Sequence, residues 1–214
     1  MEKFTVVAPV GKEINNIFIG IRDFPTEKLI LLTPANKVRA AEKIVKQVDK
    51  FKIPVKVVEI GGNIWESLFE KISQIKKVEG EKKLLINTAS ADRSSQCALT
   101  SAAFVNGIRA FAVEDGDTML LPILKFSYYK LLTDKKMSIL KLLYQDKTCC
   151  ASLDELSKKT KMSLPLISYH INGTLKSDGL KKLGLVETTE EGGKIGVSLS
   201  TMGKLLIKGY VPLC

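Results

Sequence analysis

The residues of this sequence that are best suited to chemistry lie between positions 87 and 93, where an aliphatic run ends in Asn-Thr-Ala-Ser-Ala-Asp-Arg. The hydroxyls of Thr88 and Ser90, with backbone N–H groups at a helix start, can hydrogen-bond an oxyanion or a ribose, and Arg93 adds positive charge. The alternative interpretation is an ordinary helix start, with Ser90 or Asp92 as N-cap and Arg93 in solvent. The residue types favour the ligand site.

Several familiar catalytic and metal sites are not predicted. No G-x-G-x-x-G follows the first strand and no G-x-x-x-x-G-K-[ST] occurs, which disfavours dinucleotide oxidoreductases and P-loop nucleotidases. The single histidine, His170, lies far along the chain, so no Ser-His-Asp or Cys-His arrangement can be built around residues 87–93. Four cysteines without C-x-x-C spacing and one histidine do not make a convincing zinc site. We therefore expect no catalytic residues, no metal and no cofactor.

The first 120 residues alternate short aliphatic runs with segments of three- and four-residue apolar spacing. The aliphatic runs predict strands over 4–9, 28–33, 55–60, 83–88 and 109–114. The segments between them predict helices over 13–23, 36–51, 63–77 and 92–106. Such βαβ units predict an α/β domain over residues 1–122, with a doubly wound, mostly parallel Rossmann-like sheet. The Asp-Gly-Asp-Thr turn at 115–118 adds an antiparallel edge hairpin.

In a sheet of this kind, ligands bind beyond the carboxyl ends of the strands, where the strand order reverses. The rule selects the segments 8–11, 33–36, 61–63 and 87–93. The predicted effector-binding residues are Pro9, Gly11, Thr33, Asn87, Thr88, Ala89, Ser90 and Arg93.

The positive charge of the chain is concentrated in its C-terminal part. Residues 1–122 carry 18 basic and 15 acidic side chains, a net of +3, and residues 123–214 carry 15 and 8, a net of +7. An excess of this kind is typical of a region that meets a polyanion, although a lysine-rich solvated surface is the alternative.

The pattern of residues 123–214 predicts helices followed by a hairpin. After helical residues up to about 145, a helix over 152–162 begins with Ser152 as N-cap and Glu155 three places on, and a helix over 163–176 has Pro165 in its first turn. Two strands follow over 186–200, and a last helix follows over 201–210. This order predicts a C-terminal winged helix-turn-helix domain over 123–214 that binds DNA.

Wheel geometry divides the 163–176 helix into two faces. The apolar face, expected to point inward, holds Leu164, Ile167, Ile171, Thr174 and Leu175. The outward face and its flanks hold Pro165, Ser168, Tyr169, His170, Asn172 and Lys176. Residues 123–214 contain no arginine, so the predicted base contacts fall to Ser168, Tyr169, His170, Asn172 and Lys176. The predicted phosphate contacts are Lys181, Lys182 and Lys194.

Two resemblances extend this interpretation. The stretch SLPLISYHI (163–171), followed by GLVE (184–187), resembles the recognition helix and the start of the wing in ArsR- and MarR-like regulators. The stretches VVAPVGKEINNI (6–17), KLILLTP (28–34) and INTASADRSSQCALTSAA (86–103) resemble CARF domains, the Rossmann-like sensors of CRISPR-associated proteins, and above all the archaeal CARF-like plus winged-helix transcriptional regulators. Asn87 and Arg93 fit the first and last positions of the CARF fourth-strand pattern, whereas Ala89 stands at its Ser/Thr position and Asp92 is a further departure.

The resemblance implies a homodimer whose paired α/β domains hold a nucleotide-type effector, such as a cyclic oligoadenylate, and thereby bias the spacing of two winged helices on double-stranded DNA. Two alternatives stay open: a ring nuclease that degrades cyclic oligoadenylate, and a winged helix that binds protein. No apolar run approaches the ~20 residues of a membrane span, and the N-terminus lacks the features of a signal peptide. We therefore expect a cytoplasmic protein without a membrane partner.

Overall fold

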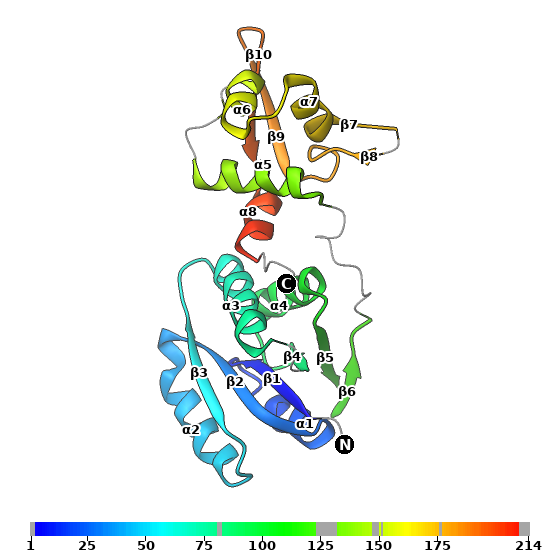
Figure 1. The fold of residues 1–214 in the computed structure, drawn as a ribbon. Helices are drawn as coiled ribbons and strands as arrows, with labels where there is room; N and C mark the ends of the chain where they lie inside the picture. The colour runs from blue at the N-terminus through cyan, green and yellow to red at the C-terminus, as the bar shows by residue number, and fades with distance from the viewer. Residues whose placement is uncertain are drawn as a thin grey trace. The chain divides into compact units, whose positions relative to one another are not determined.

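The computed structural model describes residues 3–80, 83–122, 132–146, 150, 152–175 and 177–209. These residues form two compact units; the first runs from blue to green in Figure 1, and the second from green to red. Unit 1 holds the described residues up to 122 together with Gly209, and unit 2 holds those from 132 to 208. The domain boundary predicted at residue 123 lies outside the described residues.

Unit 1 is built on a six-stranded sheet in the order β3-β2-β1-β4-β5-β6. Neighbouring strands are parallel except β5 and β6, which pair antiparallel, so the predicted mostly parallel sheet with an edge hairpin is confirmed. The chain adds β2 and β3 on one side of β1 and then returns to add β4 on the other, so the strand order reverses between β1 and β4. The strands are β1 (Phe4–Pro9), β2 (Thr26–Pro34), β3 (Val55–Ile60), β4 (Leu84–Asn87), β5 (Arg109–Glu114) and β6 (Asp117–Leu120).

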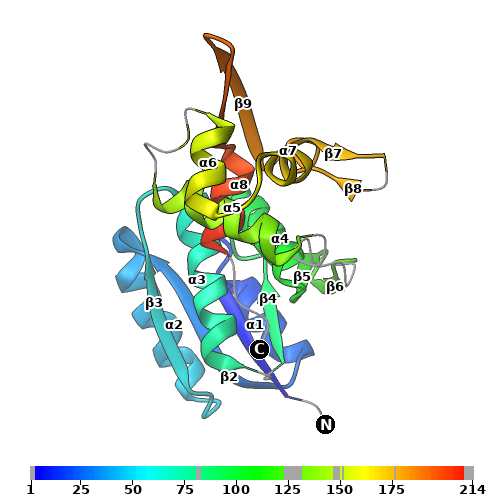
Figure 2. The same ribbon diagram turned by 45° about the horizontal axis from the view of Figure 1, so that its top comes forward.

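Helices cover both faces of this sheet, as Figures 1 and 2 show. One core cluster joins alternate residues of β1 and β2, such as Val6 and Leu29, to Ile17 of α1 and Ile44 of α2. On the opposite face α3 and α4 pack against each other. The period-two pattern of the strands and the apolar stripes of the helices produce this doubly wound arrangement. The helices are α1 (Asn15–Asp23), η1 (Ala35–Lys37), α2 (Val38–Asp49), α3 (Ile64–Glu79) and α4 (Arg93–Asn106).

Unit 2 contains three helices, two hairpins and a last helix (Figure 1). Its helix starts are capped by side chains: Thr133 accepts a hydrogen bond from the Lys136 N–H, and Ser152 accepts one from the Glu155 N–H. The N-cap predicted at Ser152 is therefore confirmed. The elements are α5 (Asp134–Gln145), α6 (Leu153–Thr160), α7 (Leu164–Asn172), β7 (Gly173–Thr174), β8 (Ser177–Asp178), β9 (Val186–Glu191), β10 (Lys194–Leu199) and α8 (Thr201–Lys208).

The predicted helix over 163–176 is wrong at its C-terminal end. Helix α7 stops at Asn172, because Gly173 has φ +80° and a Cβ on it would overlap the backbone of Gly179. The chain then turns back as the β7–β8 hairpin, in which Gly173 pairs with Asp178 and Thr174 with Ser177. As a result Leu175, which we expected to point inward, is fully exposed.

Candidate ligand edge and nucleic-acid interface

The candidate ligand site of unit 1 lies at the carboxyl ends of β1 and β4, where the strand order reverses. The chain leaves these strands in two loops, residues 10–14 before α1 and residues 88–92 before α4, which we call the switch-point loops. They touch at Gly11, where a Cβ would overlap the carbonyl oxygen of Ser90. The close approach requires glycine at position 11, so the role of Gly11 is to let the two loops pack together.

Asn87 organises the second switch-point loop from inside the protein. Its side chain is fully buried, and its Oδ1 accepts hydrogen bonds from the N–H groups of Ala89 (2.9 Å) and Ser90 (3.3 Å). Its Nδ2 donates to the carbonyl oxygen of Asn16 (2.9 Å), and the Asn16 side chain donates in return to the carbonyl of Ala89 (3.0 Å). The prediction that the Asn87 side chain contacts an effector is corrected, since its amide is used to hold α1 and the loop together.

The hydroxyls of Thr88 and Ser90 were predicted to bind a ligand, and their surroundings contradict this. Both side chains are fully buried. Thr88 Oγ1 donates to the carbonyl of Phe111 (2.9 Å), and Ser90 Oγ donates to the carbonyl of Pro9 (2.8 Å). Each hydroxyl therefore fastens the loop to a neighbouring strand, and Pro9 contributes a carbonyl acceptor to this packing rather than a ligand contact.

The start of α4 offers a charged side chain to solvent. Arg93 is the first residue of the helix, is exposed, and within the described part of the chain makes no hydrogen bond or ion pair. The N-cap is Asp92, whose carboxylate accepts hydrogen bonds from the N–H (3.1 Å) and the Oγ (2.9 Å) of Ser95. The N-cap interpretation of Asp92 is therefore confirmed. The Ser95 N–H and, to a smaller extent, the nearby charge of Lys37 hold the pKa of the Asp92 carboxyl below its usual value.

Thr33 is the one predicted effector residue with an unused buried group. It lies near the end of β2 beside the first switch-point loop, where the Val10 N–H donates to the carbonyl of Leu32 (2.8 Å). The Thr33 side chain is buried, and its hydroxyl has no hydrogen-bond partner among the described residues. Because such a group is costly when unpaired, Thr33 is suited to receive a ligand or a water molecule at this edge.

Sequence reasoning missed Asn16 and Lys37 at this edge. Asn16 interrupts the apolar pattern of the 13–23 segment with an amide, which was a usable signal. Lys37 lies close enough to Asp92 to lower the pKa of its carboxyl, so the chain segment after β2 comes near the start of α4. Within the described residues, no group of three or more His, Cys, Asp or Glu side chains could hold a metal ion. None of the described helices is long and apolar enough to cross a membrane.

In unit 2, α7 exposes part of the face that was predicted to read DNA. Tyr169 is 39% exposed, Asn172 and Pro165 are exposed, and Ser168 is half-buried. The Asn172 side chain donates to Ser168 Oγ (3.1 Å), which links two of the predicted base contacts along the helix. Lys176 lies outside the described residues.

His170 was predicted to contact a base, and the structure contradicts this. It is only 5% exposed, and neither ring nitrogen has a hydrogen-bond partner among the described residues. Burial lowers the pKa of His170, and the nearby charges of Lys136 and Lys135 lower it further. His170 is therefore a neutral packing residue, and the wheel placed it on the flank of the exposed face although the folded chain buries it near Lys135 and Lys136 of α5.

The lysines that were predicted to contact phosphates lie at the surface of unit 2. Lys181 and Lys194 are exposed. Lys182 is also exposed, and its Nζ lies 2.7 Å from Asp178 Oδ1. An exposed ion pair of this kind is weak, so Lys182 can exchange its partner for a phosphate at low cost.

Solved structures with remote similarity to this chain include the following three. VC1899 from Vibrio cholerae has 13% sequence identity and a TM-score of 0.47 over 96% of this chain and 64% of that one. Can2 from Sulfobacillus thermosulfidooxidans, in complex with cyclic tetra-adenylate, has 11% identity and a TM-score of 0.47 over 96% and 61%. Csm6 from Enterococcus italicus, bound to cyclic hexa-2'-fluoro-hexa-dAMP, has 12% identity and a TM-score of 0.49 over 81% and 51%. The chain thus spans less than two thirds of each of these chains.

No curated protein sequence matches this chain. A family match covers most of unit 1: residues 5–116, which are 112 of the 214 residues, match the model described as HFX_2341_N-like, N-terminal. This chain therefore belongs to the HFX_2341_N-like family through its N-terminal domain.

Proposed function

We propose that this protein is a cytoplasmic, ligand-responsive regulator of transcription, a homodimer in which unit 1 binds a nucleotide-type effector and unit 2 binds double-stranded DNA as a winged helix-turn-helix. The observation that carries the proposal is the exposed polar face of α7, with Tyr169 and Asn172, beside the exposed lysines of a strongly basic unit.

The case for DNA rests on charge and on element order. Residues 123–214 carry a net charge of +7. Helices α5, α6 and α7 precede the β9–β10 hairpin, which is the order in which a recognition helix is followed by a wing. Lys181 and Lys194 would contact phosphates, and Tyr169 with Asn172 would face base edges. Without arginine in this region, we expect strong salt dependence and modest sequence preference.

The case for an anionic effector rests on Arg93 and Thr33. Arg93 is exposed and without an ion pair among the described residues, at the edge of the sheet where ligands bind in this class of fold. Thr33 has a buried hydroxyl that no described residue satisfies. The resemblance of residues 86–103 to CARF domains makes cyclic oligoadenylates the first effectors to test. We propose a sensor without catalysis, so the appearance of linear products on incubation with a cyclic oligoadenylate would overturn that part.

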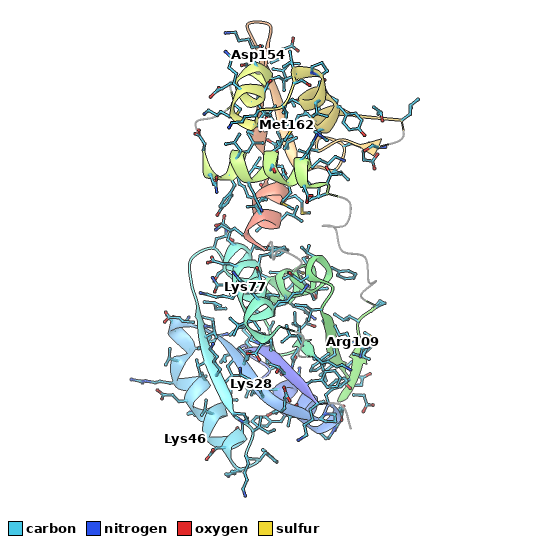
Figure 3. The ribbon with its side chains drawn as sticks, in the orientation of Figure 1. Lys28, Lys46, Lys77, Arg109, Asp154 and Met162 are labelled. Atoms are coloured by element: carbon cyan, nitrogen blue, oxygen red, sulfur yellow. The ribbon has the colours of Figure 1, made fainter. Side chains whose placement is uncertain are left out.

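DNA binding is tested by fluorescence anisotropy with a labelled duplex of mixed sequence. Lys181→Glu with Lys182→Glu should abolish most of the affinity and reduce the slope of log affinity against log salt. The matched control is Lys46→Glu on α2 of unit 1 with Lys50→Glu at the C-cap of that helix, which makes the same change in net charge; Lys46 is labelled in Figure 3. Equal loss in both double variants would show that only total charge matters and would refute the assigned surface.

Effector binding is tested by thermal unfolding with a panel of cyclic and linear oligoadenylates, because a ligand that binds only the folded state raises the unfolding midpoint. Arg93→Ala should abolish the rise. Arg109→Ala, at the amino end of β5 and so at the opposite edge of the sheet, should keep it (Figure 3). A rise that survives Arg93→Ala would exclude Arg93 from the site.

A further inference from the structure

The β7–β8 hairpin projects from the end of α7 with an apolar side chain at its tip. Both views of the chain show the hairpin extending away from the other elements of unit 2 (Figures 1 and 2). Leu175 follows Thr174 directly after β7, and it is fully exposed, whereas the next most exposed large apolar side chain of unit 2, Met202, is 49% exposed. Packing in unit 2 therefore does not account for a leucine at this position.

The base of the hairpin is held firmly to α7. The backbones of Gly173 and Gly179 are so close that a Cβ on either would overlap the other strand. The N–H of Leu180 donates to the carbonyl of His170 (2.9 Å), and the Lys136 side chain, itself buried, donates to the carbonyl of Asp178 (2.6 Å). The base of the hairpin is thus fixed relative to α7.

The charge around the hairpin is suited to nucleic acid. Residues 173–182 contain three lysines, Lys176, Lys181 and Lys182, and one acidic residue, Asp178. Asp178 is paired with Lys182, so the segment presents net positive charge beside its exposed leucine. A protein partner would instead be expected to meet a wider apolar patch.

We infer that the β7–β8 hairpin is a further DNA-binding element, whose tip places Leu175 in the minor groove next to the major groove occupied by α7. Two residues in each arm make the hairpin about 7 Å long, which is close to the depth of the minor groove, about 7.5 Å. Apolar side chains inserted there unstack a base step and bend the duplex. This inference rests on the proposed function and adds a minor-groove contact to it.

The test uses the full chain and a duplex selected from a random pool by the wild-type protein. Affinity is measured by anisotropy, and bending by energy transfer between dyes on the two duplex ends. Leu175→Ala should weaken binding about fiftyfold and reduce the bend, because it removes three side-chain carbon atoms that would be buried in the groove. Leu175→Met, which keeps an apolar tip, should retain both. Met202→Ala on α8 is the control and should change neither.

The possible outcomes separate this inference from the proposed function. If Leu175→Ala binds and bends DNA like the wild type while Lys181→Glu with Lys182→Glu binds weakly, the inserted tip is wrong and DNA binding stands. If Leu175→Ala changes only the sedimentation of the protein, the tip is a protein contact and the inference is overturned. If the wild-type protein binds no duplex, both the inserted tip and the proposed DNA binding are wrong.

Discussion

Replacing His170 by leucine should stabilise unit 2 and remove most of its pH dependence near neutrality. His170 is buried in α7, and its two ring nitrogens have no hydrogen-bond partner among the described residues. A neutral imidazole carries one N–H donor and one acceptor, and both lose their water on folding. Leucine is apolar and of similar size, so it fills the same space without that cost.

The magnitude follows from these contacts. An unsatisfied buried polar group costs about 1–3 kcal/mol, which His170→Leu recovers. The substitution also removes the edge-to-face contact between His170 and Tyr169, whose ring centroids are 5.2 Å apart. Such aromatic contacts contribute about 0.5–1.5 kcal/mol. The net gain is therefore about 1 kcal/mol, or about 4–8 °C in the unfolding midpoint of a unit of this size.

The pH dependence has a definite sign. Burial lowers the pKa of folded His170 below its ordinary value of 6.5. Below that pH the imidazole binds a proton in the unfolded chain but stays neutral in the folded chain, so the free energy of unfolding decreases. The wild-type stability of unit 2 that depends on a neutral His170 is thus fully present above about pH 6.5, and it is lost as the pH falls from there toward the pKa of His170 in the folded state. His170 is the only histidine of the chain, so few other side chains titrate in this window.

The assay is calorimetric unfolding of wild type and His170→Leu at about pH 7.5 and about pH 5.5. Trp65, the only tryptophan, lies in α3, so its fluorescence follows unit 1 separately and serves as an internal control. DNA affinity should stay within about twofold, because His170 is buried. A variant that is less stable at the higher pH, or that keeps the wild-type pH dependence, would refute the claim that the imidazole is buried, neutral and unpaired.

Three further substitutions test the two sites. Gly11→Ala should destabilise unit 1 by more than about 2 kcal/mol in chemical denaturation, because its Cβ would overlap the Ser90 carbonyl; an unchanged midpoint would contradict the close approach of the loops. Asn87→Ala should cost about 1–3 kcal/mol, since it leaves the Ala89 and Ser90 N–H groups without their acceptor, and the same measurement would show it. Tyr169→Ala should relax sequence preference in a selection from random duplexes and should cost no more stability than its ring contact with His170, about 0.5–1.5 kcal/mol; a larger loss with sequence preference unchanged would make Tyr169 a packing residue.

Local sequence pattern was sufficient for the architecture of unit 1. The strands predicted over 4–9, 55–60 and 109–114 have the same bounds in the structure, and those over 28–33 and 83–88 differ at their ends by one or two residues. Alternation of strands and helices determines a parallel sheet because each crossover must return along the same direction. The edge of the sheet that carries the candidate site could also be predicted, because ligands of such sheets bind beyond the carboxyl ends of the strands.

Only the tertiary structure decided which side chains remain available there. Ser90 and Thr88 looked like ligand donors, but each meets a carbonyl of a strand far away in sequence, on Pro9 and Phe111. In unit 2, wheel geometry assumed a helix up to residue 176, and the contact of Gly173 with Gly179 ends it at Asn172. Short-range periodicity describes how a helix or strand is built, whereas the direction of a hydroxyl and the end of a helix depend on what the folded chain brings beside them.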